Sequence, residues 1–199
     1  MGITERRLRQ QDEIRQQIIA ASWQIISAEG WQAFSIRRIA DAIEYSVPVI
    51  YKHFENKEAI QEYFIKEGFA NLTIDMQQAK QKAGTPEACI EEMAFAYWRF
   101  AATKTAYYRI MFSLGIPHCE TVNSVVEMKQ MSTLMFEAIA NLAKTYEHQD
   151  IYLKLKTFWS MLHGFISIEL LSNSIIPAEP TPMFADAIES FKFTLINKK

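Results

Sequence analysis

The spacing of apolar residues most constrains how this chain can fold. Side chains three and four positions apart share one face of an α-helix, whereas a half-buried strand alternates polar and apolar residues. The first long segment has apolar residues at helical steps of four, three, four and three, and no segment sustains a period-two alternation. This apolar stripe consists of Ile14, Ile18, Ala21, Ile25 and Ala28. The pattern predicts an all-α protein.

Capping residues predict where the N-terminal helices begin and end. Gly30 is expected to end the first helix, because glycine tolerates the left-handed conformation that follows a helix. Ser35 and Ser46 are candidate N-caps of two short helices. Asn56 would cap a longer helix that continues to about residue 82.

The clearest break in the sequence is Gly84, Thr85 and Pro86, with Thr85 as N-cap and Pro86 at the first helical position. Further helices are expected over residues 86–102, 106–114, 121–146 and 150–172, and after Pro182. We assign residues 1–56 to an N-terminal domain and residues 57–199, which begin with the long helix, to a larger helical domain.

Composition and charge exclude several classes of protein. Hydrophobic residues make up 49% of the chain, which is enough for a sizeable core. The least charged stretch, residues 157–168, has only about half of the ~20 apolar residues that a membrane-spanning helix needs. The N-terminal arginines precede polar residues rather than the apolar run of a secretory signal. We expect a cytoplasmic protein with no membrane partner, and the net charge of −2 leaves room for a local basic patch.

Neither a cofactor nor a metal ion is expected. Cys89 and Cys119 lie in unrelated contexts and are predicted to be buried free thiols. His118, His148 and His163 lack the spacing of metal ligands.

Residues 35–54 have the pattern of a helix-turn-helix. Two short helices, the second over residues 47–54, are joined by a tight turn at Glu44 and Tyr45. A short second helix with polar and aromatic tips can enter the major groove of DNA while its N-terminus faces phosphate. Other small helical bundles contain the same arrangement, so the spacing alone leaves DNA binding and simple helix packing equally open.

The wider stretch over residues 18–60 resembles the DNA-binding domain of TetR-family transcriptional regulators. The matching positions are Ala20, Ala21, Gly30 with the aromatic Trp31, Ser35, Ile36, Ile39, Ala40, Ser46, Tyr51, His53, Phe54, Lys57 and Glu58. The resemblance implies a homodimer in which each N-terminal three-helix unit reads a DNA half-site. It also implies that the C-terminal domain binds a small molecule and forms the dimer.

Two positions depart from the family pattern. Glu44 stands in the turn where the family usually has glycine, and a glutamate at positive φ costs about 1 kcal/mol. Either the turn is strained or its geometry differs. Val47 replaces the polar or basic residue that often follows the serine, which removes one DNA contact.

Transferred residue by residue, the resemblance predicts a set of DNA contacts. They are Ser35, Arg37, Tyr45, Ser46, Val47, Tyr51, Lys52, His53 and Lys57. Hydroxyl and ammonium groups suit phosphate, and Tyr45 could touch a thymine methyl or a base edge. For His53, phosphate contact and simple packing remain open, whereas Ile50 and Phe54 are expected in the core.

Cations outside this set allow several interpretations. Arg38 could be a solvated surface charge. The N-terminal Arg6, Arg7 and Arg9 could follow the DNA backbone, enter the minor groove, or lie on an unstructured solvated tail.

The C-terminal segment 157–165 contains Trp159, His163 and Gly164, which resemble the W-x-x-x-H-G pattern of one C-terminal class of TetR regulators. Gly164 would let another helix approach closely. The candidate pocket residues are Trp98, Tyr107, Tyr108, Met111, Phe112, Met131, Met135, Trp159 and His163. They could bind an apolar or aromatic effector, or they could form the core.

His163 has three possible roles: a histidine buried among its hydrogen-bond partners, a polar anchor for a ligand, or a catalytic base. No serine elbow, Cys-His-acid set or glycine-rich phosphate loop accompanies it, so we do not expect an enzyme.

The last two helices carry apolar residues on more than one side, which a monomer would leave in water. These residues are Ile166, Ile168, Leu170, Leu171, Phe184, Ile188 and Phe193. Pairing with a second copy would form an intermolecular four-helix bundle.

The sequence therefore indicates a homodimeric regulator, expected to be a repressor that an effector releases from a palindromic operator. The long helix that begins at residue 57 would act as the lever. The alternatives are a helical ligand-binding protein with weakened DNA binding, or an all-α enzyme that uses His163.

Overall fold

The computed structural model describes residues 3–112, 125–172 and 175–197, and all of their regular elements are helices, which confirms the predicted all-α class. Element bounds are α1 (Ile3–Glu29), the 3₁₀ helix η1 (Trp31–Ala33), α2 (Ile36–Ala42), α3 (Val47–Tyr51), α4 (Lys57–Lys82), α5 (Pro86–Thr103), α6 (Thr105–Met111), α7 (Val126–Leu142), α8 (His148–Ser172) and α9 (Pro182–Ile196). The expected break near Gly115 and the thiol of Cys119 lie outside the described residues.

The chain divides into two compact units, Met1–Ile65 and Lys66–Lys199. The division falls inside α4, nine residues after the expected boundary between residues 56 and 57. The first turns of α4 belong to the first unit because Ile60 and Phe64 are buried there, with the ring of Phe64 5.3 Å from that of Trp23.

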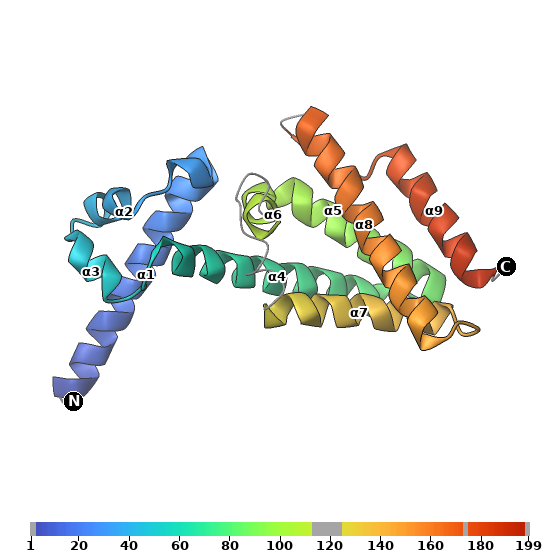
Figure 1. The fold of residues 1–199 in the computed structure, drawn as a ribbon, viewed down its shortest axis with the longest axis horizontal. Helices are drawn as coiled ribbons and strands as arrows, with labels where there is room; N and C mark the ends of the chain where they lie inside the picture. Colours follow the sequence, from blue (N-terminus) through green and yellow to red (C-terminus); the bar gives the residue numbers. More distant parts are fainter. Residues whose placement is uncertain (1–2, 113–124, 173–174, 198–199) are drawn as a thin grey trace. The chain divides into compact units, whose positions relative to one another are not determined.

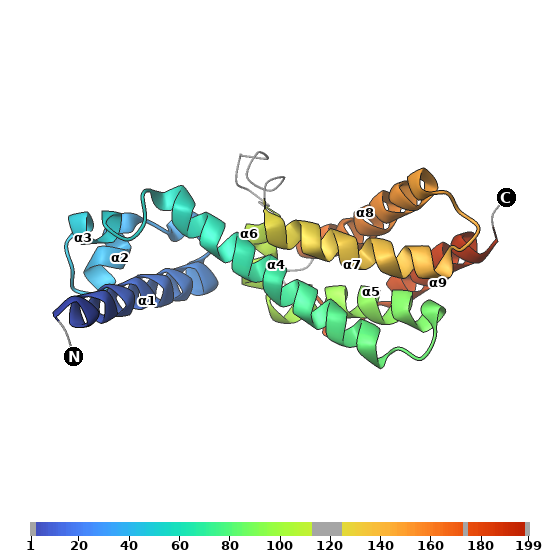
Figure 2. The same ribbon diagram turned by 90° about the horizontal axis from the view of Figure 1, so that it is seen from below.

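The first unit is built on α1, with α2 and α3 packed beside it (Figure 1, Figure 2). Ile18, Ala21 and Ile25 of the apolar stripe are buried in this core, whereas Ile14 is half-buried and Ala28 is exposed. Gly30 ends α1 with φ 81°, and its N–H donates to the carbonyl of Ile26 at 2.9 Å. Ile39 and Ile50 complete the interior from the two short helices.

Helix α1 begins at Ile3, well before the apolar stripe. Arg6, Arg7 and Arg9 therefore lie on an exposed helical turn, and the alternative of an unstructured tail is wrong.

Three predicted N-caps are confirmed. The side chains of Ser35, Asn56 and Thr85 accept backbone N–H groups three residues further on, at 3.3, 2.7 and 3.1 Å respectively. Ser46 occupies the N-cap position of α3, but its hydroxyl accepts no capping hydrogen bond. Helix α3 also ends at Tyr51, earlier than expected.

The second unit is arranged around α5, which packs against α6, α7, α8 and α9. Tyr97 and Trp98 are completely buried on α5. Helix α4 approaches α6 closely at Gly68, where an added Cβ would lie 2.5 Å from the sulfur of Met111. Within the described ranges, no helix has the length and apolar character needed to span a membrane.

Candidate functional site

The turn between α2 and α3 keeps the expected geometry despite its glutamate. Glu44 has φ 58°, in the left-handed region. The N–H of Tyr45 donates to the carbonyl of Ala40 at 3.0 Å, and that of Glu44 to Asp41 at 3.3 Å. These two bonds form the Schellman motif that ends many helices, usually with glycine at the left-handed position. The interpretation of a strained turn is therefore confirmed, and that of a different turn geometry is wrong.

Helix α3 has one buried side and one exposed side. Ile50 and Phe54 are buried, as predicted. The side chains of Tyr45 and Tyr51 are 39% and 50% exposed, and Lys52 and Arg37 are also exposed. The remaining predicted DNA contacts are exposed at Ser46 and half-buried at Ser35, Val47, His53 and Lys57. The fold thus presents hydroxyl, aromatic and cationic groups around the outward side of α3.

Arg15 ties the end of the helix-turn-helix to α1. Its guanidinium donates to the carbonyl of His53 at 2.9 Å and lies 4.3 Å from the centre of the Phe54 ring. Burial, followed by the charges of Arg15 and Lys52, lowers the pKa of His53. The His53 imidazole therefore favours its neutral form, which makes it a weaker partner for phosphate than a cation.

Lys57 begins α4 beside the α1–α2 connection. Its ammonium lies 4.7 Å from the ring centre of Trp31 and 5.3 Å from that of Phe34. The two rings stack on each other with centroids 4.5 Å apart. Cation–π contacts of this kind hold an ammonium group in place while leaving hydrogens available to an anion.

His163 is the centre of a hydrogen-bond chain in the second unit. Its Nδ1 lies 2.6 Å from the hydroxyl of Tyr108, and its Nε2 lies 3.3 Å from that of Ser167. The ring of Tyr97 packs edge-on against that of Tyr108 with centroids 6.0 Å apart, and the Tyr97 hydroxyl accepts the indole N–H of Trp159 at 3.3 Å. These contacts join α5, α6 and α8.

The protonation states give this chain a direction. Burial raises the pKa of Tyr108 and that of Tyr97, so both phenols stay protonated. Burial lowers the pKa of His163, which favours the neutral imidazole. Tyr108 therefore donates its O–H to Nδ1 of His163, and Nε2–H is left to donate to Ser167. The first interpretation of His163, a histidine surrounded by hydrogen-bond partners, fits this arrangement.

The candidate pocket residues fall into two groups. Tyr107, Phe112, Trp159 and His163 are half-buried, and the rings of Phe112 and His163 are 4.6 Å apart. The fully buried members are Trp98, Tyr108, Met111, Met131 and Met135. Among them, Trp98 donates its indole N–H to the carbonyl of Pro177 at 2.8 Å. Its polar group is therefore bound to the connection between α8 and α9 and not to His163.

Sequence reasoning missed Tyr97 and Ser167 as members of this cluster. Ser167 could have been found, because it lies four residues after His163 on the same helix. Tyr97 had no local signal, since it reaches the cluster from α5. Tyr107 points elsewhere and donates its hydroxyl to the carboxylate of Glu67 at 2.6 Å.

A separate hollow of about 270 Å³ lies between α4 and α5, with Asp75, Lys82, Glu92 and Arg99 among its lining residues. None of the candidate pocket residues lines it. In the part of the chain that the structure describes, no three His, Cys, Asp or Glu side chains are grouped as metal ligands. Cys89 is buried, and burial raises the pKa of its thiol.

The described residues thus combine an all-α architecture, a helix-turn-helix and a second, larger helical unit. Residues 18–63 match the family model described as bacterial regulatory proteins, tetR family. Residues 90–191 match the model described as tetracyclin repressor-like, C-terminal domain. The chain belongs to the TetR family.

Solved structures show the same fold at low sequence identity. A regulatory protein in the tetR family from Rhodococcus RHA1 is 18% identical, with a TM-score of 0.67 over 91% of this chain and 96% of that one. The regulator FadR from Bacillus subtilis, in complex with stearoyl-CoA, is 15% identical, with a TM-score of 0.68 over 92% and 98%. No curated protein matches the sequence.

Replacing Glu44 with glycine should stabilise the first unit. Glycine adopts φ 58° without the steric cost that a Cβ carries, so we expect the free energy of unfolding of Glu44→Gly to rise by about 1 kcal/mol. Chemical denaturation would measure it. Glu44→Ala, which keeps the Cβ, is the control and should gain nothing. Equal stability of the glycine and alanine variants would contradict the strained turn.

The neutral state of His163 should make stability depend on pH. Because its pKa is lowered in the fold, the unfolded chain takes up a proton first as the pH falls below about 6.5. We expect the free energy of unfolding to fall between about pH 6.5 and 5, and to fall less in His163→Gln. His53→Gln, measured in parallel, separates the similar contribution of His53. If His163→Gln kept the pH dependence of the wild type, the assignment of a neutral His163 in the folded protein would be contradicted.

Proposed function

We propose that this protein is a transcriptional repressor that binds a palindromic DNA operator as a homodimer and is released by a small apolar or aromatic effector. The observation that carries the proposal is the two-sided α3. Its apolar side is buried while Tyr45, Tyr51 and Lys52 face solvent, within a helix-turn-helix of a TetR-family chain. A helix held in this way can enter the major groove.

The roles of the DNA contacts follow from their chemistry. Tyr51 and Lys52 donate to phosphate oxygens on one side of the groove, and Lys57 donates on the other. Tyr45 lies against a base edge or a thymine methyl. The remaining contacts that we propose are Ser35, Arg37, Ser46, Val47 and His53.

The homodimer is supported by the outward side of α8. The residues on this side are spaced by three or four positions: Leu153, Thr157, Ser160, Gly164, Ile168 and Leu171. An added Cβ at Gly164 would meet nothing within 4 Å, so no described part of its own chain approaches it. Small central residues between apolar ends allow close approach of a second α8.

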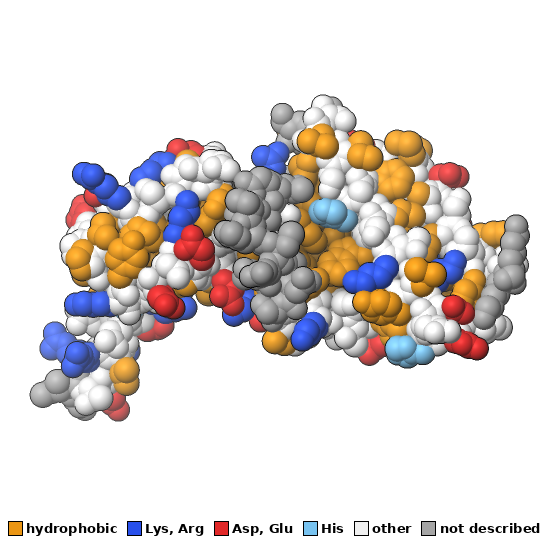
Figure 3. Space-filling model, viewed as in Figure 1, with side chains coloured by type: hydrophobic (Ala, Val, Ile, Leu, Met, Phe, Trp, Pro, Cys, Tyr) orange, Lys and Arg blue, Asp and Glu red, His pale blue; other side chains and the backbone are white. Residues whose placement is uncertain are grey.

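Some residues expected at this interface serve the fold of one protomer instead. Ile166, Phe184 and Ile188 are completely buried within the second unit. Ile168, Leu171 and Phe193 are exposed and remain the proposed contacts, with hydrophobic side chains visible over α8 and α9 (Figure 3).

The proposed effector site lies around His163 and Phe112. Helix α6 connects this place with α4, since the rings of Phe112 and Phe69 are 5.5 Å apart and Gly68 packs on Met111. Helix α4 is continuous from Lys57 to Lys82, so a shift of α6 can reach the DNA-binding unit. The stearoyl-CoA bound by the Bacillus subtilis FadR supports an effector with an apolar part.

Two other functions receive less support. A disrupted turn between α2 and α3 would support the alternative of a ligand-binding protein that has lost DNA binding. The Schellman bonds at Glu44 are intact, so the turn does not support it. A catalytic base would need a substrate proton within reach, whereas the two ring nitrogens of His163 already face Tyr108 and Ser167. We propose instead that His163 holds the side chains of Tyr108 and Ser167 in place beside the effector site.

The proposed function is tested by selecting genomic DNA fragments with the purified full-length chain at near-physiological salt. We expect the wild type to enrich a palindromic site, because two α3 helices read symmetric half-sites. The double variant Tyr51→Ala/Lys52→Ala should lose this enrichment while keeping its helical content, since both side chains face solvent. Enrichment of the same site by the variant would contradict the assigned contacts. If the wild type enriched no site, the proposal that the protein binds a palindromic operator would be overturned.

Ile168→Asp should convert the dimer into monomers. The side chain is 61% exposed, so the change spares the protomer core but places two carboxylates in the proposed interface. Sedimentation velocity would show the shift in mass, and circular dichroism the retained fold. Leu8→Asp is the matched control, because Leu8 is also 61% exposed but lies on α1. A dimeric Ile168→Asp variant would contradict the interface.

A further inference from the structure

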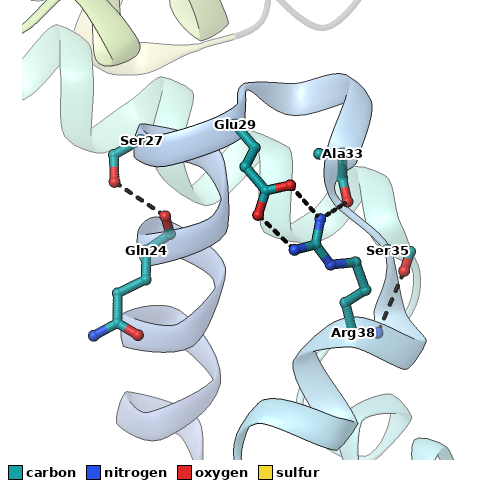
Figure 4. Close-up of polar contacts among 6 residues, drawn as sticks. All are labelled: Gln24, Ser27, Glu29, Ala33, Ser35 and Arg38. Atoms are coloured by element: carbon teal, nitrogen blue, oxygen red, sulfur yellow. Dashed lines mark hydrogen bonds and ion pairs between the residues drawn. The ribbon is translucent and has the colours of Figure 1, made fainter.

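Arg38 connects three points of the chain between α1 and α2 (Figure 4). Its backbone N–H donates to the hydroxyl of Ser35 at 3.3 Å. Its guanidinium donates to the two carboxylate oxygens of Glu29, at 2.9 and 2.5 Å, and to the carbonyl of Ala33 at 3.0 Å. The end of α1, the 3₁₀ turn η1 and the start of α2 are thus held by one residue, and Arg38 is an exposed surface charge that is paired with Glu29.

The geometry of the Arg38–Glu29 pair is better suited to fixing the orientation of the chain than to stabilising the fold. A guanidinium that bonds both oxygens of one carboxylate fixes the relative orientation of the two groups, which a lysine cannot do. The side chains of Arg38 and Glu29 are 43% and 49% exposed, and exposed ion pairs contribute little to the free energy of unfolding. The hydrogen bond from Arg38 lowers the pKa of Glu29, which keeps the carboxylate ionised.

The segment that Arg38 holds also carries the aromatic pair against which Lys57 lies. Ala33 is flanked in sequence by Gln32 and Phe34, and Phe34 is buried with its ring stacked on Trp31. The ammonium of Lys57 lies within 5.3 Å of both ring centres. Fixing the carbonyl of Ala33 therefore fixes the surface on which this ammonium group rests.

We propose that Glu29 and Arg38 are positioning residues that act through the Trp31–Phe34 pair to place the ammonium of Lys57 for contact with a DNA phosphate. The inference rests on the proposed function, since it concerns a phosphate contact of the same DNA-binding unit. Arg38 itself stays on Glu29 in the complex. Arg37, its exposed neighbour, remains available to DNA.

If Arg38 contacted phosphate directly, a substitution at Glu29 would change the affinity for DNA in the opposite direction. If Arg38 had to leave Glu29 to reach DNA, removal of the Glu29 carboxylate would free the guanidinium and strengthen binding. If Arg38 positions Lys57, the same removal weakens binding. The two mechanisms are therefore separated by one substitution.

The experiment measures operator affinity at several salt concentrations with the full-length chain. The variants are Glu29→Gln, Arg38→Gln, Lys57→Gln and the double variant Arg38→Gln/Lys57→Gln. We expect Glu29→Gln and Arg38→Gln to weaken binding by a similar factor, about two- to fivefold. Lys57→Gln should reduce the slope of log affinity against log salt by about two, one phosphate for each half-site. Arg38→Gln should have no further effect in the Lys57→Gln background.

Arg99→Gln is the matched control. Arg99 pairs with Glu92 on α5, and the two side chains are 42% and 48% exposed, almost as in the Glu29–Arg38 pair. The same cation is lost from a site outside the DNA-binding unit, so operator affinity should stay unchanged.

The inference is overturned if Glu29→Gln strengthens binding, or if the losses from Arg38→Gln and Lys57→Gln are additive. It also fails alone if the wild type binds its operator and Glu29→Gln and Arg38→Gln both bind that operator as tightly as the wild type does. A wild type that binds no operator would overturn the proposed function and this inference together. Thermal unfolding of each variant by circular dichroism separates loss of positioning from loss of fold.

Discussion

The burial of Ile50 and Phe54 is the constraint on which the DNA-binding unit depends. Helix α3 has only five residues, too few to be stable in water, so packing must hold it in place. Arg15 adds a hydrogen bond to the carbonyl of His53 and a contact with the Phe54 ring. Once that side is buried, the helical period leaves Tyr51 on the solvent side, and the surface that we propose for DNA contact follows from the packing of the core.

The turn before α3 shows that backbone hydrogen bonding can outweigh a residue preference. Glu44 adopts the conformation that glycine usually takes, because the two Schellman bonds and the packing on both sides require it. The local cost is small compared with the apolar burial that it permits. Glu44 therefore adds strain to the turn without preventing the two Schellman bonds.

In the second unit, a polar chain runs through an interior that composition alone would describe as hydrophobic. Hydrogen bonds join Tyr108 of α6 to His163 of α8 and Trp159 of α8 to Tyr97 of α5, which gives the aromatic cluster defined orientations. Helix α6 contributes to this chain and also packs on α4 at Gly68. A single short helix thus contacts both the proposed effector site and the helix that continues into the DNA-binding unit.

The sequence by itself determined the properties that depend on near neighbours in the chain. These include the helical class, the capping side chains of Ser35, Asn56 and Thr85, and the buried side of α3, because capping and helical periodicity act within a few residues. Tertiary structure decided which partners distant residues find. The pairing of Arg38 with Glu29, the link from Tyr97 to His163, and the inward turn of Ile166 all depend on how separate helices pack, which no local pattern encodes.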